Sequence, residues 1–179
     1  MDLVERAALF ARAAHGAIDQ RRKYDGTAYI NHPAEVADIL VRFATLPVTQ
    51  EQIAAAWLHD TVEDTKITLD DIRDCFGAEV ELLVEGLTDV SRPEDGNRRV
   101  RKQKDLDHTA AASPAAKSVK LADLISNSRS IVQHDPDFAR VYLHEKSRIL
   151  EVCGDADPGL LAEAYRVLAE ARNILNASR

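Results

Sequence analysis

A short polar cluster near residue 60 carries side chains whose types and spacing suit metal chemistry. His59 and Asp60 are adjacent and follow an apolar run, and Glu63 and Asp64 come about one helical turn later. A neighbouring imidazole and carboxylate can both ligate a metal if the helix ends or distorts at that point. The two later carboxylates would then lie close enough to handle a water bound to that metal. The alternative is an acidic helix end that is only solvated, which is common.

Two further polar residues, His32 and Asp123, stand in positions that suit the same site. His32 precedes Pro33 at the expected start of a helix, and Asp123 interrupts an otherwise apolar helix turn, residues 119–124. A charged carboxylate there is costly unless it is paired or binds a metal. Two imidazoles and two carboxylates suit Mn²⁺ or Fe²⁺ and could take Zn²⁺, and on an octahedral ion they leave two positions for water or substrate. The alternatives are a helix cap for His32 and a buried arginine partner for Asp123.

Helical periodicity predicts the elements that would position these side chains. Thr49 and Gln52 have the form of a capping box, so a helix begins there and ends near His59 and Asp60. Other helices are predicted over residues 3–19, from near Pro33, from Thr68 to about 76, directly after Gly77, from 114 to about 132, and from 136 and 158. Residues 91–97 and the basic segments 21–23 and 98–104 are expected to be loops. The fold class is therefore all-α, a single domain over residues 1–179 with its core at about 7–150 and roughly eight or more helices.

Composition restricts the partners and the compartment. The net charge of −7 argues against nonspecific binding to nucleic acid or to an anionic membrane, so a highly anionic substrate would need a locally basic pocket or a cation. No apolar run reaches the length of a membrane span, and the N-terminus lacks the layout of a signal peptide. Cys75 and Cys153 lack CxxC spacing and are expected to be small buried residues in a reducing, cytoplasmic protein.

Three motifs give the sequence a resemblance to a known family. They are Tyr29-Ile30-Asn31-His32-Pro33, His59-Asp60-Thr61-Val62-Glu63-Asp64-Thr65 and Lys120-Leu121-Ala122-Asp123. In this order they resemble the HD-domain metal phosphohydrolases, and more narrowly the hydrolase domain of the RelA/SpoT alarmone enzymes. The best match is to the stand-alone small alarmone hydrolases that are similar to metazoan SpoT homologues. The resemblance runs from about Ala7 to Arg148.

The resemblance implies an activity and a set of site residues. The activity is metal-dependent hydrolysis of the 3′-diphosphate of ppGpp or pppGpp, which releases pyrophosphate and leaves GDP or GTP. One Mn²⁺ ion, with Fe²⁺ or Zn²⁺ as other options, would be held by His32, His59, Asp60 and Asp123. Glu63 and Asp64 would orient and deprotonate the attacking water. The implied substrate contacts are Arg22, Lys23, Arg101, Lys102, Asn127 and Tyr142.

Departures from the family pattern leave alternatives open. Leu124, Ser126 and Ser128 replace a basic residue, an aromatic or histidine, and an apolar residue, respectively, that the family often has. They leave the ligand set intact but affect the expected details of nucleotide recognition. The alternatives are an HD phosphatase that acts on another phosphorylated nucleotide such as NADPH, and a catalytically silent module that binds an alarmone. Arg98, Arg99 and Lys104 are interpreted as surface residues, no synthetase domain is expected, and the oligomeric state is left open, with a homodimer as one option.

Overall fold

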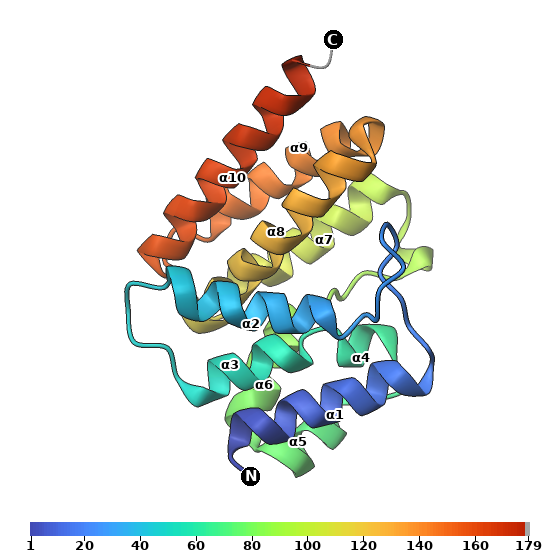
Figure 1. Cartoon of the computed structure of the whole chain (residues 1–179), viewed down its shortest axis with the longest axis vertical. Helices are drawn as coiled ribbons and strands as arrows, with labels where there is room; N and C mark the ends of the chain where they lie inside the picture. Colours follow the sequence, from blue (N-terminus) through green and yellow to red (C-terminus); the bar gives the residue numbers. More distant parts are fainter. Residues whose placement is uncertain (178–179) are drawn as a thin grey trace.

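The computed structural model describes residues 1–177 and builds them from helices, which confirms the predicted all-α class (Figure 1). Within these residues the only strand-like pairing is an isolated antiparallel bridge between Arg21 and Ala28. The extent of the single domain stays a prediction. The helices are α1 (Leu3–Ala17), α2 (Asn31–Phe43), α3 (Gln50–Leu58), α4 (Thr61–Asp64), α5 (Leu69–Phe76), α6 (Ala78–Leu87), η1 (Pro93–Asp95), α7 (Arg98–Ala111), α8 (Pro114–His134), α9 (Pro136–Val152) and α10 (Pro158–Ala177).

Local capping explains most of the helix starts. The Thr49 hydroxyl accepts from the Gln52 backbone N–H, and the Gln52 side chain accepts from the Thr49 N–H, so the predicted capping box is confirmed. The prediction of a loop over residues 98–104 was wrong. Asn97 caps α7 by accepting from the Val100 N–H, and the long charged side chains that follow are good helix formers.

Helix α8 lies at the centre of the molecule and packs against α2, α3, α6, α9 and α10. Figure 1 shows α7 to α10 gathered toward the C-terminal end, with α2 lying between them and the group formed by α1, α3, α5 and α6. The α8 side chains Val119, Ala122 and Ile125 are all fully buried. Because α8 also carries Asp123, this central position places a carboxylate in the interior of the protein.

The N-terminus of α10 is tied to the C-terminal end of α2. Asp157 accepts backbone hydrogen bonds from Thr45 and Leu46, just after α2, and from Gly159 and Leu160 in the first turn of α10. A Cβ atom at Gly159 would lie 2.3 Å from the Phe43 carbonyl oxygen, so only glycine permits this approach. These contacts fix the helix that carries His32.

The two cysteines differ in burial. Cys153 is buried, as expected, but Cys75 is exposed, so that part of the expectation was wrong. Cys75 lies near the end of the short amphipathic helix α5, whose buried side chain is Ile72. None of the helices within residues 1–177 combines the length and the apolar character that crossing a membrane requires.

Candidate metal centre and substrate cavity

A break between α3 and α4 brings His59 and Asp60 to one point. Helix α3 ends at Leu58, and His59 and Asp60 form a turn before α4 begins at Thr61, with φ −97° and ψ −3° at Asp60. The Thr61 hydroxyl donates to the Leu58 carbonyl at 2.7 Å and so holds the corner together. The break lets an imidazole and the carboxylate that follows it face the same neighbours, α2 and α8.

Four side chains from three parts of the chain converge at this corner. The Nε2 atom of His59 lies 2.9 Å from Asp60 Oδ2 and 3.8 Å from Asp123 Oδ1. The Nε2 atom of His32 lies 3.1 Å from Asp123 Oδ1 and 3.6 Å from Asp60 Oδ2. The candidate ligand atoms of His32, His59 and Asp123 all lie within 4.8 Å of one another. This spacing is that of donor atoms arranged around one cation.

The donor set fits a divalent cation. His59 Nδ1 lies 2.8 Å from the Ala56 carbonyl oxygen, which only accepts, so Nδ1 carries a proton. The other nitrogen, Nε2, is buried and has no hydrogen bond of good geometry among the described residues. It is therefore the nitrogen that faces the two carboxylates and is available to a metal. Such a fixed ring orientation is typical of metal-ligating histidines.

Neighbouring charges keep both carboxylates ionised. Burial alone would raise the pKa of Asp60, but the positive charge of the adjacent His59 lowers it to about 2. Burial is likewise outweighed at Asp123, where His32, His59 and Lys120 hold the pKa of the carboxyl below its usual range. Burial would lower the pKa of His59, but Asp60 raises it to about 9. Metal binding would release the proton held at this imidazole.

Glu63 and Asp64 both lie on α4, which begins directly after Asp60, and of the two only Glu63 is among the described residues that line the adjoining cavity. Glu63 accepts a hydrogen bond from the Asp89 backbone N–H at 3.1 Å, and Asp64 accepts one from the Gln20 side chain at 2.8 Å. Enclosure by the cavity wall raises the pKa of Glu63 to about 7, and the negative charge of Asp89 adds to this effect. Burial also raises the pKa of Asp64. A carboxylate with a pKa near neutrality is well matched to accepting a proton at neutral pH.

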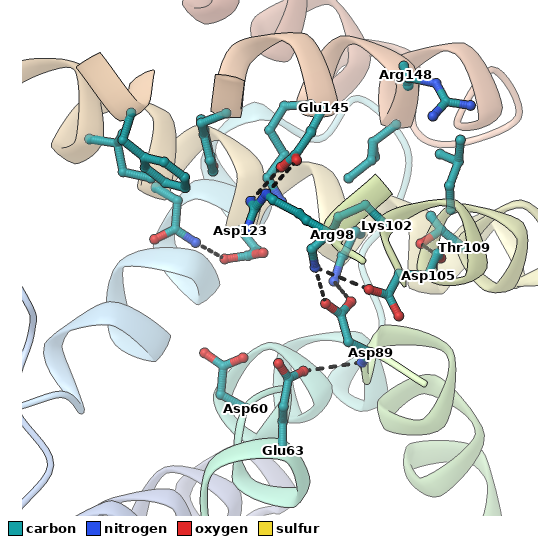
Figure 2. Close-up of a pocket in the computed structure, with 18 of the residues that line it drawn as sticks. Asp60, Glu63, Asp89, Arg98, Lys102, Asp105, Thr109, Asp123, Glu145 and Arg148 are labelled. Carbon is teal, nitrogen blue, oxygen red and sulfur yellow. Dashed lines mark hydrogen bonds and ion pairs between the residues drawn. The ribbon is translucent and has the colours of Figure 1, made fainter. Parts of the chain in front are cut away.

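The cluster opens into a cavity of about 380 Å³, drawn in Figure 2. Asp60 and Glu63 form one side of it, Asp89 and α7 a second, and Asp123 with α9 the remainder. Cationic side chains from three helices face this space: Arg98 and Lys102 from α7, Lys120 from α8, and Lys146 and Arg148 from α9. The cavity of an acidic protein therefore has a wall that suits an anionic ligand.

Comparison with known proteins identifies the fold family. The HD-domain family matches residues 7–149, which is most of the chain. This protein belongs to the HD-domain family. Its match covers the cluster at the α3–α4 corner and all of α8.

The relatives of this HD domain include guanosine-3′,5′-bis(diphosphate) 3′-pyrophosphohydrolases and bacterial proteins named GTP pyrophosphokinase rsh. The mouse guanosine-3′,5′-bis(diphosphate) 3′-pyrophosphohydrolase MESH1 is 44% identical over 125 residues, covering 69% of this chain and 68% of the mouse protein. The human MESH1 enzyme is 43% identical over 132 residues, covering 73% of this chain and 70% of the human protein. A solved structure described as a metazoan orthologue of SpoT that hydrolyses ppGpp superposes with a TM-score of 0.83 at 26% identity, covering 97% of both chains.

The residues predicted to contact substrate divide into two groups in this HD domain. Lys102, Asn127 and Tyr142 line the cavity. Lys102 lies between Asp89 and Asp105, at 2.7 Å and 3.1 Å from their carboxylates, and Asn127 donates to Asp123 Oδ1 at 2.6 Å. Burial raises the pKa of Tyr142, so its hydroxyl stays protonated. Their places in the wall are compatible with the predicted contacts.

The other predicted substrate contacts are not part of the cavity wall within the described residues. Arg22 is only 15% exposed and forms an ion pair with Glu35 at 3.1 Å. Lys23 is 71% exposed and lies 3.6 Å from Asp135. The Nε atom of Arg101 is buried and has no hydrogen-bond partner among the described residues. Their contacts with a substrate stay predictions.

Several cavity residues were missed in the sequence. Arg98 is exposed, as interpreted from the sequence, but it also lines the cavity and forms a bidentate pair with Glu145. Tyr29 donates to Asp60 at 2.6 Å, and Lys120 donates to the Leu87 carbonyl at 3.0 Å. The sequence could have indicated Lys120 as a cavity residue, because it precedes Asp123 by three residues and so shares its helix face. No sequence pattern indicates Lys146, since its helix reaches the cavity only through tertiary packing.

We expect Asp123→Ala to lower the affinity of the metal-free protein for Mn²⁺ by more than about 100-fold, because one of the converging donors is lost. The measurement is calorimetric titration with Mn²⁺, supported by elemental analysis of the purified protein. Asp74→Ala, a change of an exposed carboxylate on α5, is the control and should leave the affinity unchanged. Full metal occupancy in Asp123→Ala would exclude Asp123 as a ligand.

Proposed function

We propose that this protein hydrolyses the 3′-diphosphate of ppGpp or pppGpp and releases pyrophosphate, leaving GDP or GTP. The observation that carries the proposal is the convergence of two imidazoles and two carboxylates at the edge of a cavity whose wall includes lysines and arginines from three helices. Relatives covered over about two thirds of their length are named for this reaction, which supports the choice of substrate. The metal ligands in this proposal are His32, His59, Asp60 and Asp123.

The arrangement of side chains suggests how the reaction proceeds. When bound, a divalent cation supplies a water of lowered pKa and positive charge near the phosphate. Glu63 and Asp64 orient the water and take its proton at a carboxylate oxygen. Lys102 and Lys120 line the cavity, where their ammonium groups can hold oxygens of the 3′-diphosphate. Because phosphoryl transfer needs little covalent help from the protein, positioning and charge neutralisation account for most of the catalysis.

Finer points of the sequence analysis belong to the same proposal. Mn²⁺ is the proposed cation, because mixed imidazole and carboxylate donors suit it, although Fe²⁺ and Zn²⁺ bind similar sets. A cytoplasmic location is proposed from the two unpaired cysteines. The extent of the domain and the homodimer option are retained as predictions.

The proposal is tested by measuring pyrophosphate release from ppGpp, with Mn²⁺ and after chelation, beside NADPH and other phosphorylated nucleotides. We expect release from ppGpp that depends on Mn²⁺ and stops with the chelator. Turnover of another nucleotide but not of ppGpp would support the metal centre but show that the substrate is a different nucleotide. Metal binding without turnover of any compound would favour the alarmone-binding module.

Asp64→Asn should retain metal but lose about 10²- to 10⁴-fold in kcat, because an amide cannot take the proton of the water. Single-turnover kinetics on ppGpp and metal analysis of the same sample give both quantities. Asp70→Asn, on the exposed side of α5, serves as the matched control. Unchanged turnover at equal metal content would remove Asp64 from the mechanism.

The rate should fall in acid because Glu63 acts only as a carboxylate. Its pKa is raised to about 7, so the active form is present above that value and is lost as the pH decreases through it. A cation at Asp60 would lower this pKa, which places the inflection in kcat/KM at or below about 7, with a slope of about tenfold per pH unit beneath it. Glu63→Gln should lose this inflection. A profile identical to that of the wild type in Glu63→Gln would assign the titration to another group.

A further inference from the structure

A chain of polar side chains leads away from His32 on the side opposite the metal cluster. His32 Nδ1 lies 3.1 Å from Ser126 Oγ, and Ser126 Oγ donates to Glu35 Oε2 at 2.8 Å. Glu35 Oε2 also accepts from Arg22 Nη1 at 3.1 Å. His32 and Ser126 are 2% and 1% exposed, so the inner part of this chain is shielded from water.

Glu35, at the outer end of this series of side chains, determines the direction of each hydrogen bond in it. Glu35 pairs with a guanidinium and is a carboxylate, so it can only accept. The single hydrogen of the Ser126 hydroxyl is therefore directed to Glu35. The Ser126 oxygen is left to accept, and the hydrogen it accepts is that on His32 Nδ1. The nitrogen left for a cation is Nε2, which faces Asp123 and Asp60.

We propose that Ser126 and Glu35 are positioning residues for the metal ligand His32, and that Arg22 is the counter-charge that holds Glu35 in place. This inference rests on the proposed function, because it takes His32 as a ligand. The relay, which is the series of hydrogen bonds from His32 through Ser126 to Glu35, fixes the His32 ring so that its lone pair lies on Nε2. The negative charge of Glu35 makes the imidazole a stronger electron donor to a metal. Partners of this kind, which contact a ligand rather than the metal, commonly change metal affinity by about 10- to 100-fold.

The placement of the relay follows a simple helical register. Glu35 follows His32 by three residues on α2, and Ser126 follows Asp123 by three residues on α8. Each helix thus presents a candidate ligand and, about one turn later on the same face, a residue that supports it. Ser126 is also a position where the sequence departs from the family pattern.

The ion pair with Glu35 gives Arg22 a role other than the predicted contact with substrate. Arg22 comes from the loop between α1 and α2, and its guanidinium reaches Glu35 in a half-buried ion pair. The loop is thereby connected to the metal cluster through three hydrogen bonds. The positive charge of Arg22 compensates the negative charge of Glu35, whose partial burial beside Ser126 would otherwise be unfavourable.

The test is calorimetric titration of the metal-free protein with Mn²⁺, which does not depend on turnover. Ser126→Ala should weaken binding by about tenfold, because His32 Nδ1 loses its acceptor. Ser126→Thr, which keeps a hydroxyl, should restore most of the affinity. Ser128→Ala is the matched control, since Ser128 is an equally buried serine on the same helix, and it should bind Mn²⁺ as the wild type does.

A second variant keeps the inference testable if Ser126→Ala fails to fold, which circular dichroism and thermal unfolding would show. Glu35→Ala removes the outer acceptor from a partly exposed position and should also weaken Mn²⁺ binding by about tenfold. Asp38→Ala, an exposed carboxylate on the same helix, is its control. Wild-type affinity in both Ser126→Ala and Glu35→Ala, or in Glu35→Ala alone if the serine variant is unfolded, would overturn the relay. An absence of Mn²⁺ binding by the wild-type protein would instead overturn the proposed metal centre.

Discussion

The structure depends on the gathering of two carboxylates and two imidazoles, three of them buried and Asp60 half-buried, at the junction of α2, α8 and the α3–α4 corner. Groups of this kind are costly in a protein interior unless their charges are compensated. Here His59 lies against Asp60, and His32 lies against Asp123, so each acid has a basic neighbour within hydrogen-bonding range. The remaining donor atoms point toward a common centre, which is the arrangement that a divalent cation would stabilise further.

The same compensation of charge extends through the cavity. The chain is acidic as a whole, yet lysines and arginines from three helices line the space beside the cluster. Many of them are paired with acids in the structure, as Lys102 is with Asp89 and Asp105, and Arg98 with Glu145. An anionic substrate would compete with these acids for the cations. The cavity is therefore suited to a ligand that carries several negative charges, such as a diphosphate.

Support for the cluster comes from residues that do not touch its centre. Tyr29 donates to Asp60, Asn127 donates to Asp123, and Gln20 connects Asp64 to the buried His15, whose Nδ1 lies 2.7 Å from the Gln20 side-chain oxygen. The loop between α1 and α2 supplies Gln20, Tyr29 and Arg22, so it acts mainly as a brace in this structure. Its basic residues were expected to meet substrate, whereas Arg22 points instead toward Glu35.

The sequence by itself determined the helical class, most helix starts and the four converging side chains. These follow from short-range rules: capping residues such as Thr49 act within one turn, and a carboxylate such as Asp123 within an apolar helix turn requires a compensating partner. Only the tertiary structure decided which cations meet the cavity and which residues brace the ligands. Arg98 and Lys146 reach the cavity, and Ser126 meets Glu35, because α7, α8, α9 and α2 pack together. Contacts between residues far apart in the chain depend on helix orientation, which local periodicity does not encode.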